Sequence, residues 1–368
     1  MAMTLRAGRG APFGRLVGVG GIGTGLFLAI EGNRTLGRDE SRGARLIDAR
    51  DYCKLHIVAH YVAVLLGADL SGARFHVVPV GAVGDDERGR RLVAEMKAAG
   101  IDTARVTVVD EPTLFSVCLR YPDGSGGNLT TIDSAAASLT VADVDAVEPL
   151  LAADGTRTIA LAAPEVGLEC RRRLLELATA HGALRAASFT SSEVRAAHKD
   201  GTLALVDLLA LNAEEASALS GLELDPDRPG PVLDACARAA PGARLVLTAG
   251  AAGAIGFEEG RWVRRRPPAV PVVSAAGAGD ALLAGVLAAT AAGVPLLPAE
   301  EDETLLSSAL DLGVLLAALS VTSPHTIHPG AGLEAMLELA RTAGRRIAPP
   351  LADAVEPPLA DAVERSET

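Results

Sequence analysis

Short apolar runs of strand length alternate with helical segments along most of this 368-residue chain, and this alternation constrains the fold more than any other feature. The runs that we predict as buried strands are residues 16–20, 75–80, 159–162, 184–188, 205–211 and 245–248. The predicted helices span residues 54–66, 86–99, 171–180, 213–220, 281–292, 304–319 and 333–343. Repeated strand–helix units predict an α/β fold in which helices cover both faces of a mainly parallel sheet.

Composition and charge narrow the class of partner. Apolar residues make up 49% of the chain and aromatic residues only 3%, so the interior must be built mainly from Ala, Val and Leu. A formal net charge of −12 argues against a nucleic-acid partner, because that binding depends on clustered Lys and Arg. Every apolar stretch is interrupted before the ~18 residues that a membrane span requires. We therefore expect small-molecule partners, and neither nucleic acid nor a membrane.

The cysteines and the N-terminal region bear on the compartment. Cys53, Cys118, Cys170 and Cys236 form no CxxC pair, so neither a zinc site nor a disulfide framework is indicated. Residues 16–30 follow several arginines, as in an export signal, but five of these fifteen residues are glycine. Each glycine weakens a helix by about 1 kcal/mol relative to Ala, so this stretch is a poor candidate for the apolar helix of an export signal. We therefore predict a cytoplasmic protein.

Several segments lie outside the main alternation. Runs at 106–109, 116–120 and 128–132 are predicted to form strands of a separate small sheet, the last two joined by the turn-rich residues 122–126. Residues 33–52 carry many charges and little periodicity, and we expect an irregular, solvent-facing excursion there. We expect residues 1–14 to be flexible. We also expect residues 346–368, which contain two copies of PPLADAVE, to be disordered.

The strongest chemical signal is the sequence SAAGAGD at residues 274–280, which leads directly into a helical run. Small residues at a helix start expose backbone N–H groups that can stabilise a phosphoryl group during transfer. Gly277, Ala278 and Gly279 would form this anion hole, and Asp280 would accept the proton of an acceptor hydroxyl. The alternative is an Asp that only caps the helix after a small-residue turn.

The order of the other motifs shows a family resemblance. The sequence VGAVGDDERG at residues 80–89, followed by KAAGIDT at 97–103, is similar to two consecutive motifs of the ribokinase-like (PfkB) kinases. With SAAGAGD, the resemblance extends over roughly residues 15–335. It implies a three-layer sandwich with a mainly parallel central sheet and a small β lid. The kinase domain would span residues 15–345, with the lid near 26–52 and 112–132.

The resemblance also implies an activity and a set of binding residues. The expected reaction is transfer of the ATP γ-phosphoryl group to a hydroxyl of a sugar, nucleoside or related small molecule. LNAEE at 211–215 is similar to the family's NxxE element, in which Asn212 and Glu215 help to hold Mg²⁺ through water. A capping role for Asn212 is the alternative. The turn after residues 245–248 implies nucleotide contacts from Thr248, Gly250 and Gly253.

The acceptor side departs from the family pattern. Gly25 stands where the family usually has an Asp that binds substrate hydroxyls, and Gly81 is expected to approach the substrate. Lys54 and His56 replace residues of the family's GGxxxN element, and His60 follows on the same helical face. Such a stripe would suit an acceptor that carries phosphate or carboxylate, whereas the alternative is a solvated Lys54 and packed histidines. Ser274 and residues 187–190 also differ, which makes monovalent-cation activation doubtful.

Two other functions compete with the kinase. The glycines of GVGGIG at residues 18–23 match a dinucleotide-binding fingerprint and would indicate an NAD-dependent oxidoreductase, which needs a helix directly after them. A nucleotide-binding regulator that keeps the fold without turnover is the second alternative. By the resemblance, a homodimer through the lid is a further expectation.

Overall fold

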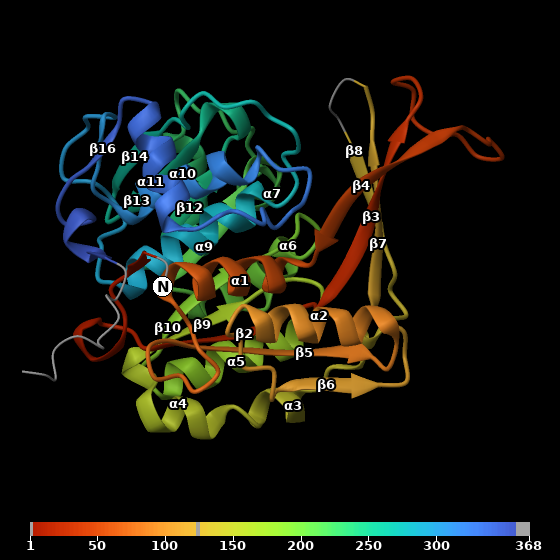
Figure 1. The fold of residues 1–368 in the computed structure, drawn as a ribbon, viewed down its shortest axis with the longest axis horizontal. Helices are drawn as coiled ribbons and strands as arrows, with labels where there is room; N and C mark the ends of the chain where they lie inside the picture. The colour runs from red at the N-terminus through yellow and green to blue at the C-terminus, as the bar shows by residue number, and fades with distance from the viewer. Residues whose placement is uncertain (1–2, 123–125, 358–368) are drawn as a thin grey trace, which may run out of the picture.

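The computed structural model describes residues 3–122 and 126–357, and its centre is a large, mainly parallel sheet (Figure 1). The strand order is β14-β13-β12-β11-β10-β9-β2-β5-β6, and all neighbours from β12 to β6 are parallel. The strands are β2 (Arg15–Val19), β5 (His76–Gly84), β6 (Val106–Val109), β9 (Thr158–Ala162), β10 (Leu184–Ser188), β11 (Leu208–Asn212), β12 (Arg244–Thr248), β13 (Ala254–Glu258) and β14 (Arg261–Arg265). The predicted α/β class is confirmed.

Helices cover both faces of this sheet, as the strand–helix alternation predicts. The helices are α1 (Lys54–Leu66), α2 (Glu87–Ala98), α3 (Val141–Asp145), α4 (Glu148–Asp154), α5 (Leu168–Ala180), α6 (Val194–Lys199), α7 (Ala213–Ser220), α8 (Gly230–Ala239), α9 (Ala278–Ala291), α10 (Ala309–Ser320) and α11 (Leu333–Thr342). The neighbouring helices α1, α9 and α10 bury almost every side chain in one apolar core, built mainly from Ala, Val and Leu. Two further cores lie around α5 and α8.

A second, four-stranded sheet stands away from the body at one end of the large sheet (Figure 1). Its strand order is β4-β3-β7-β8, and the strands are β3 (Gly23–Ile30), β4 (Ala44–Tyr52), β7 (Leu114–Arg120) and β8 (Gly126–Thr130). The predicted irregular excursion at residues 33–52 is therefore wrong for β4, whose backbone pairs with β3 despite its charged sequence. The predicted turn between β7 and β8 lies mostly outside the described residues.

The glycine-rich residues 18–23 lead from β2 into another strand. A dinucleotide-binding fingerprint requires a helix at this point, with its N-terminus at the pyrophosphate. Here β3 begins at Gly23 and runs into the small sheet, paired with β4 and β7. The NAD-binding interpretation is therefore wrong on backbone grounds.

Both ends of the described chain pack against the body. Thr4–Leu5 (β1) pairs antiparallel with Val355–Glu356 (β17), and Leu305–Leu306 (β15) pairs with Arg346–Ile347 (β16). The expectation of loose ends is wrong for these residues. Leu5, Leu351 and Ala354 are at most 1% exposed, and burial of their side chains offsets the cost of ordering the backbone. Residues 358–368 of the tail lie outside the described residues.

Among the described residues, none of the helices combines the length and the apolar character needed to cross a bilayer.

Candidate active site

The SAAGAGD motif forms the turn before α9 and the first turn of that helix. Gly277 is the N-cap residue, with a φ of 77°, and a Cβ there would lie 2.9 Å from the carbonyl oxygen of Thr326. Only glycine fits this left-handed, closely packed position. The amide of Ala278 donates to the Ala275 carbonyl at 3.3 Å. The helix N-terminus thus points its positive end toward the cavity that Gly277 and Asp280 line.

Asp280 lies in the first turn of α9 and is not its cap. The N-cap is Gly277, and no side-chain capping bond forms, so the capping alternative for Asp280 is wrong. Within residues 3–122 and 126–357 its carboxylate has no hydrogen-bond or ion-pair partner. Burial raises the pKa of Asp280, the nearby charge of Lys54 opposes this, and the charge of Asp51 adds to it. The structure thus places an acid without a side-chain partner among the described residues at the cavity wall.

The cavity has a volume of about 590 Å³ and lies between the small sheet and the carboxyl ends of the large sheet's strands. Ligands of open α/β sheets bind at that end of the strands. All four strands of the small sheet contribute residues to the cavity wall, and Phe27, Asp51, Ser116, Cys118 and Asn128 are among them. Lys54, Glu165, Asp280 and Thr326 close the cavity from the body.

Asp51 places a carboxylate on the small sheet beside Gly25. The two residues are paired across β3 and β4, and Oδ2 of Asp51 accepts a 2.6 Å hydrogen bond from the Ser116 hydroxyl. Cys118 Sγ donates to the same oxygen at 3.4 Å. Burial raises the pKa of Asp51, and these hydrogen bonds oppose the rise. The sequence interpretation missed this residue, because its position depends on the pairing of β4.

Lys54 lies among carboxylates at the start of α1. Its Nζ is 3.7 Å from Oε1 of Glu215, and its backbone amide donates to Oε2 of Glu165 at 3.3 Å. Burial disfavours the charged ammonium, but Asp280, Glu215 and Glu165 together raise the pKa of Lys54. Lys54 is thus a partly buried, charged side chain that faces the cavity's acids and is not freely solvated.

Glu165 is a second cavity acid that the sequence interpretation missed. It follows β9 in the sequence and has a φ of 77°, a conformation that costs energy for a residue with a side chain. Burial raises the pKa of Glu165 to about 7, opposed by Cys53 and Lys54. An acid just after a buried parallel strand was the signal available in the sequence.

Asn212 and Glu215 form a reciprocal capping box at the start of α7. The Asn212 side chain accepts from the Glu215 amide, and Glu215 Oε2 accepts from the Asn212 amide, both at 2.8 Å. The capping alternative is thus present, yet Oε1 of Glu215 remains directed at Lys54. Burial raises the pKa of Glu215, and Lys54 opposes this. Among the described residues, no group of three or more His, Cys, Asp or Glu side chains could hold a metal ion.

The remaining predicted residues divide into near and remote positions. Thr248 ends β12, and its Cγ2 would lie 3.9 Å from a Cβ at Gly279, which places it beside the first turn of α9. Gly250 and Gly253 follow in the turn between β12 and β13. Gly81 packs against Ile22 inside the body and does not line the cavity.

His56 and His60 are not available as an anion-binding stripe. His56 is 1% exposed, and burial lowers the pKa of its imidazole to about 3. Burial likewise lowers the pKa of His60 to about 4. The His56 ring packs edge-on against Tyr52 at 4.8 Å and does not line the cavity. The expectation that His56 contacts the acceptor is therefore wrong, because both rings are neutral and packed.

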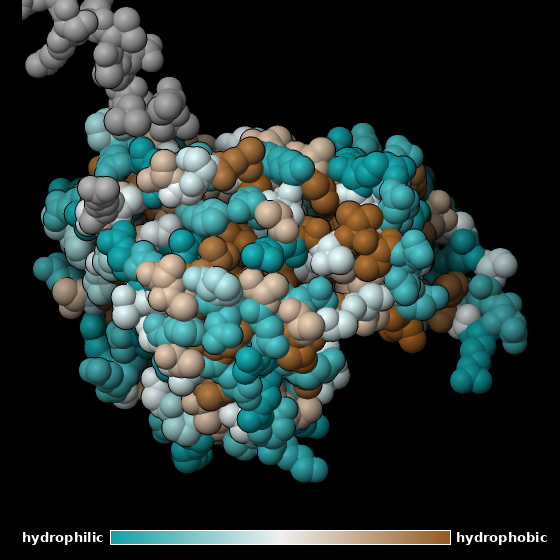
Figure 2. Space-filling model, turned by 90° about the horizontal axis from the view of Figure 1, so that it is seen from below, coloured by the Kyte–Doolittle hydropathy of each residue, from teal (hydrophilic) through white to brown (hydrophobic). Residues whose placement is uncertain are grey.

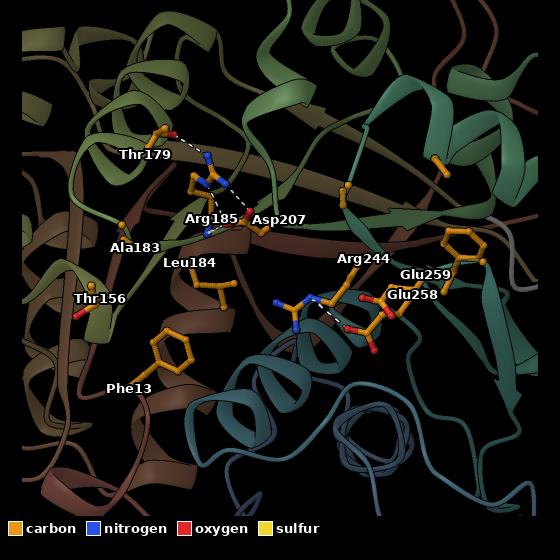
Figure 3. A pocket seen from close by; sticks show the side chains of 16 residues that line it. Phe13, Thr156, Thr179, Ala183, Leu184, Arg185, Asp207, Arg244, Glu258 and Glu259 are labelled. Atoms are coloured by element: carbon orange, nitrogen blue, oxygen red, sulfur yellow. Dashed lines mark hydrogen bonds and ion pairs between the residues drawn. The ribbon is translucent and has the colours of Figure 1, made fainter.

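A larger and more open hollow, of about 830 Å³, lies at the amino ends of β10, β11 and β12 (Figure 3). Its charged side chains are paired with each other: Arg185 bonds to Asp207 at 2.5 Å, and Arg244 approaches Glu258 at 3.9 Å. Because this hollow lies opposite the strand ends where α/β folds bind ligands, we assign the chemistry to the smaller cavity.

Comparisons with known proteins agree with this geometry. The sequence profile of the pfkB family carbohydrate kinases matches residues 58–331. A curated relative, 1-phosphofructokinase of Rhodobacter capsulatus, is 30% identical in an alignment of length 259 that covers 65% of this chain and 75% of the relative.

Solved structures share the fold at low sequence identity. Adenosine kinase of Sinorhizobium meliloti superposes with a TM-score of 0.67 at 20% identity, covering 89% of this chain and 99% of that one. A Burkholderia thailandensis nucleoside kinase in complex with inosine has a TM-score of 0.66 at 17% identity, covering 90% of this chain and 99% of that one. A putative ribokinase from Agrobacterium tumefaciens has a TM-score of 0.65 at 20% identity, covering 89% of this chain and 97% of that one.

Proposed function

Because the chain belongs to the pfkB family of carbohydrate kinases, a family of ATP-dependent phosphotransferases that act on alcohol groups, we propose that Asp280 is its catalytic base. The supporting observation is the unpartnered carboxylate of Asp280 beside a helix N-terminus in the cavity. Asp280 would remove the proton of the acceptor hydroxyl while its oxygen attacks the γ-phosphorus of ATP. The new O–P bond forms as the bond to the ADP oxygen breaks.

Gly277, Ala278 and Gly279 would stabilise the charge that spreads over the transferring phosphoryl oxygens. Amides at a helix N-terminus are fixed before the reaction begins, so no dipoles need to reorient as charge develops. The Ala278–Ala275 hydrogen bond is long, at 3.3 Å, so a phosphoryl oxygen would be a stronger acceptor for that amide. Thr248, Gly250 and Gly253 would contact the rest of the nucleotide from the β12–β13 turn.

Magnesium is proposed to be held through water by Glu215, with Asn212 fixing that carboxylate. One oxygen of Glu215 is used by the capping box, and the other faces Lys54, so the residues fit outer-sphere binding by a single carboxylate oxygen. When bound, Mg²⁺ would neutralise the β- and γ-phosphate oxygens. Lys54 would supply a further fixed positive charge near the phosphoryl group.

On the acceptor side, we propose that Asp51 binds the hydroxyls of the substrate. Its carboxylate can accept hydrogen bonds from a polyol, and Ser116 and Asn128 line the same side of the cavity. This arrangement takes over the role expected at Gly25. The small sheet would act as a lid, over residues 26–52 and 112–132, that excludes water once the acceptor is bound.

The outer face of the small sheet supports the proposed homodimer. Leu46 and Leu129 are 69% and 68% exposed, and the pairing of the strands places them with Leu28 and Val117 on the face away from the cavity. In Figure 2 the projecting arm of this sheet is hydrophilic at its tip and carries hydrophobic side chains nearer the body. A second copy of the chain would cover these leucines. Light scattering of the Leu46→Glu, Leu129→Glu variant should then report a monomer.

An acceptor screen tests the proposed function. Purified protein would be incubated with ATP, Mg²⁺ and single sugars, sugar phosphates or nucleosides, and the phosphorylated product identified by mass spectrometry. Acceptor-dependent ADP release with a matching product supports the proposal. Binding of Mg²⁺–ATP with no phosphorylated product from any acceptor would instead support the regulator. We expect the reaction to occur in the cytoplasm, where the free cysteines would stay reduced.

A further inference from the structure

The segment Pro349–Glu356 is anchored in the body although its sequence is rich in Pro and Ala. Leu351 is 1% exposed and Ala354 is fully buried, and both belong to the apolar core on the α1, α9 and α10 side of the sheet. Val355 packs against the same core. Two buried anchors, one just before a short 3-10 turn (Ala352–Ala354) and one at its end, thus hold the segment in place.

Polar contacts fix the register of this segment. Its end pairs antiparallel with β1, with Leu5 opposite Val355 and Thr4 opposite Glu356, and the Arg6 amide donates to the Ala354 carbonyl at 2.7 Å. Arg74 binds the Glu356 carboxylate at 2.6 Å while its Nε donates to the Leu66 carbonyl at 3.1 Å. We call the site formed by β1, Arg6 and Arg74, with the apolar pockets for Leu351 and Ala354, the terminal groove.

The groove selects its ligand by three features. Its apolar pockets accept a leucine and an alanine three residues apart in the bound segment. Its strand β1 pairs with extended backbone, and the cation Arg74 lies beside the last residue of that segment. Addition of a strand to an exposed edge is a common mode of peptide binding, in which main-chain bonds supply affinity and pockets supply specificity. A short peptide with a Leu-x-x-Ala-Val-Glu pattern satisfies all three features.

The chain contains that ligand twice. PPLADAVE at residues 349–356 is followed at once by an identical PPLADAVE at 357–364. We propose that the terminal groove is a binding site for this eight-residue motif and that either copy can occupy it. Leu359, Ala362 and Glu364 would then take the places of Leu351, Ala354 and Glu356. The second copy falls almost entirely outside the described residues, so the proposal rests on the groove and on the identity of the two sequences.

The exchange requires only local rearrangement. The β15–β16 ladder holds Arg346 and Ile347, so the chain enters the groove from the same fixed point in both states. When the second copy is bound, the first copy becomes an eight-residue loop whose two ends lie close together. The entropic cost of closing such a loop grows only with the logarithm of its length. Loop closure therefore makes only a small difference to the free energies of the two bound states.

Three variants of the full chain test the proposal. Leu351→Asp removes the anchor of the first copy, Leu359→Asp removes that of the second, and the double variant removes both. We expect each single variant to stay within about 2 °C of the wild-type Tm, because the other copy fills the groove, and the double variant to lose about 5 °C or more. Asp353→Lys, at an exposed position of the bound copy, is the matched control. Hydrogen exchange at the Arg6 amide should rise in the double variant alone.

Addition of a synthetic peptide to the double variant provides an independent test. Synthetic PPLADAVE added to the double variant should restore its Tm and protect the Arg6 amide, whereas PPDADAVE should do neither. The proposal is overturned if Leu351→Asp alone loses as much stability as the double variant, since the second copy then cannot bind. It is equally overturned if the double variant keeps the wild-type Tm, or if the peptide fails to rescue it.

Discussion

The carboxylate of Asp51 occupies the space that a side chain at Gly25 would need: a Cβ at Gly25 would lie 2.7 Å from Oδ2 of Asp51 and 2.1 Å from the Ser116 hydroxyl. The two positions are mutually exclusive, so a carboxylate can come from β3 or from β4 but not from both. In this chain it comes from β4. In the proposed acceptor site the acid therefore stands on β4, across from Gly25.

Removal of the Asp51 charge should weaken acceptor binding. In Asp51→Asn the hydrogen bonds to acceptor hydroxyls lose their charged partner, a loss of roughly 1.5–3 kcal/mol, or about 10- to 150-fold in kcat/KM for the acceptor. The KM for ATP should change little. Asp48→Asn, an exposed position on the same strand, is the control. Steady-state kinetics in which Asp51→Asn and Asp48→Asn behave alike would remove Asp51 from the site.

Lys54 should set the pH dependence of turnover. Its ammonium lowers the pKa values of Asp280, Glu165 and Glu215, so Lys54→Met should raise all three. The base must be ionised to act, and therefore the acidic limb of the kcat/KM profile should move to higher pH. The exposed Lys97→Met serves as the control. An unshifted acidic limb would show that Lys54 does not interact with the base.

Glu165 should make the protein less stable as the pH rises. Its folded pKa of about 7 lies above the ordinary value of 4.5, so the folded state holds a proton that the unfolded state has released. Stability is then lost between about pH 4.5 and 7, on the order of 3 kcal/mol in total. Glu165→Gln should raise the Tm at pH 8 and leave it nearly unchanged at pH 4.5, measured by thermal unfolding. Glu169→Gln, at an exposed site nearby, should do neither.

Thr326 should hold the lid strand in register with the phosphoryl site. Its amide donates to the Arg50 carbonyl at 3.1 Å, and its hydroxyl accepts from the Tyr52 amide at 3.0 Å, on either side of Asp51. Thr326→Val removes the hydroxyl contact and should cost about 1 kcal/mol of stability together with a higher acceptor KM. Thr326→Ser keeps the hydroxyl and should restore the KM. A Thr326→Val variant with unchanged acceptor KM would show that the contact is structural only.

Local sequence patterns were sufficient to predict α1 and most of the parallel sheet. The helix predicted at residues 54–66 matches α1 at both ends, because a continuous apolar run is stopped by Gly67, which adopts a φ of 61°. The central strands of the parallel sheet were predictable for the same reason, since strands such as β9 and β5 are buried and apolar. The half-exposed edge strand β6 was wrongly predicted to belong to the small sheet, whereas it pairs with β5. The proposed base and anion hole follow from a motif confined to seven consecutive residues, of which Gly277 and Asp280 line the cavity.

The acceptor side could not be predicted because it depends on pairing between distant segments. β4 carries charged residues and is largely exposed, so nothing in its own pattern distinguishes a strand from an irregular loop. The position of Asp51 in the cavity appears only once β4 is paired with β3 and β3 with β7. The histidines show the converse error: His56 and His60 share one helical face, but His56 is buried, His60 is largely covered, and burial lowers the pKa of both imidazoles.

The most direct test of the account is a single-turnover measurement on Asp280→Asn with an acceptor found by the screen. Asn keeps the size of the side chain but cannot take the hydroxyl proton, so the rate of phosphoryl transfer should fall by about 10²- to 10⁴-fold. The affinity for Mg²⁺–ATP, measured by calorimetry on the same sample, should stay nearly constant. A variant that binds Mg²⁺–ATP normally and transfers the phosphoryl group at the wild-type rate would contradict the assignment of Asp280 as the base.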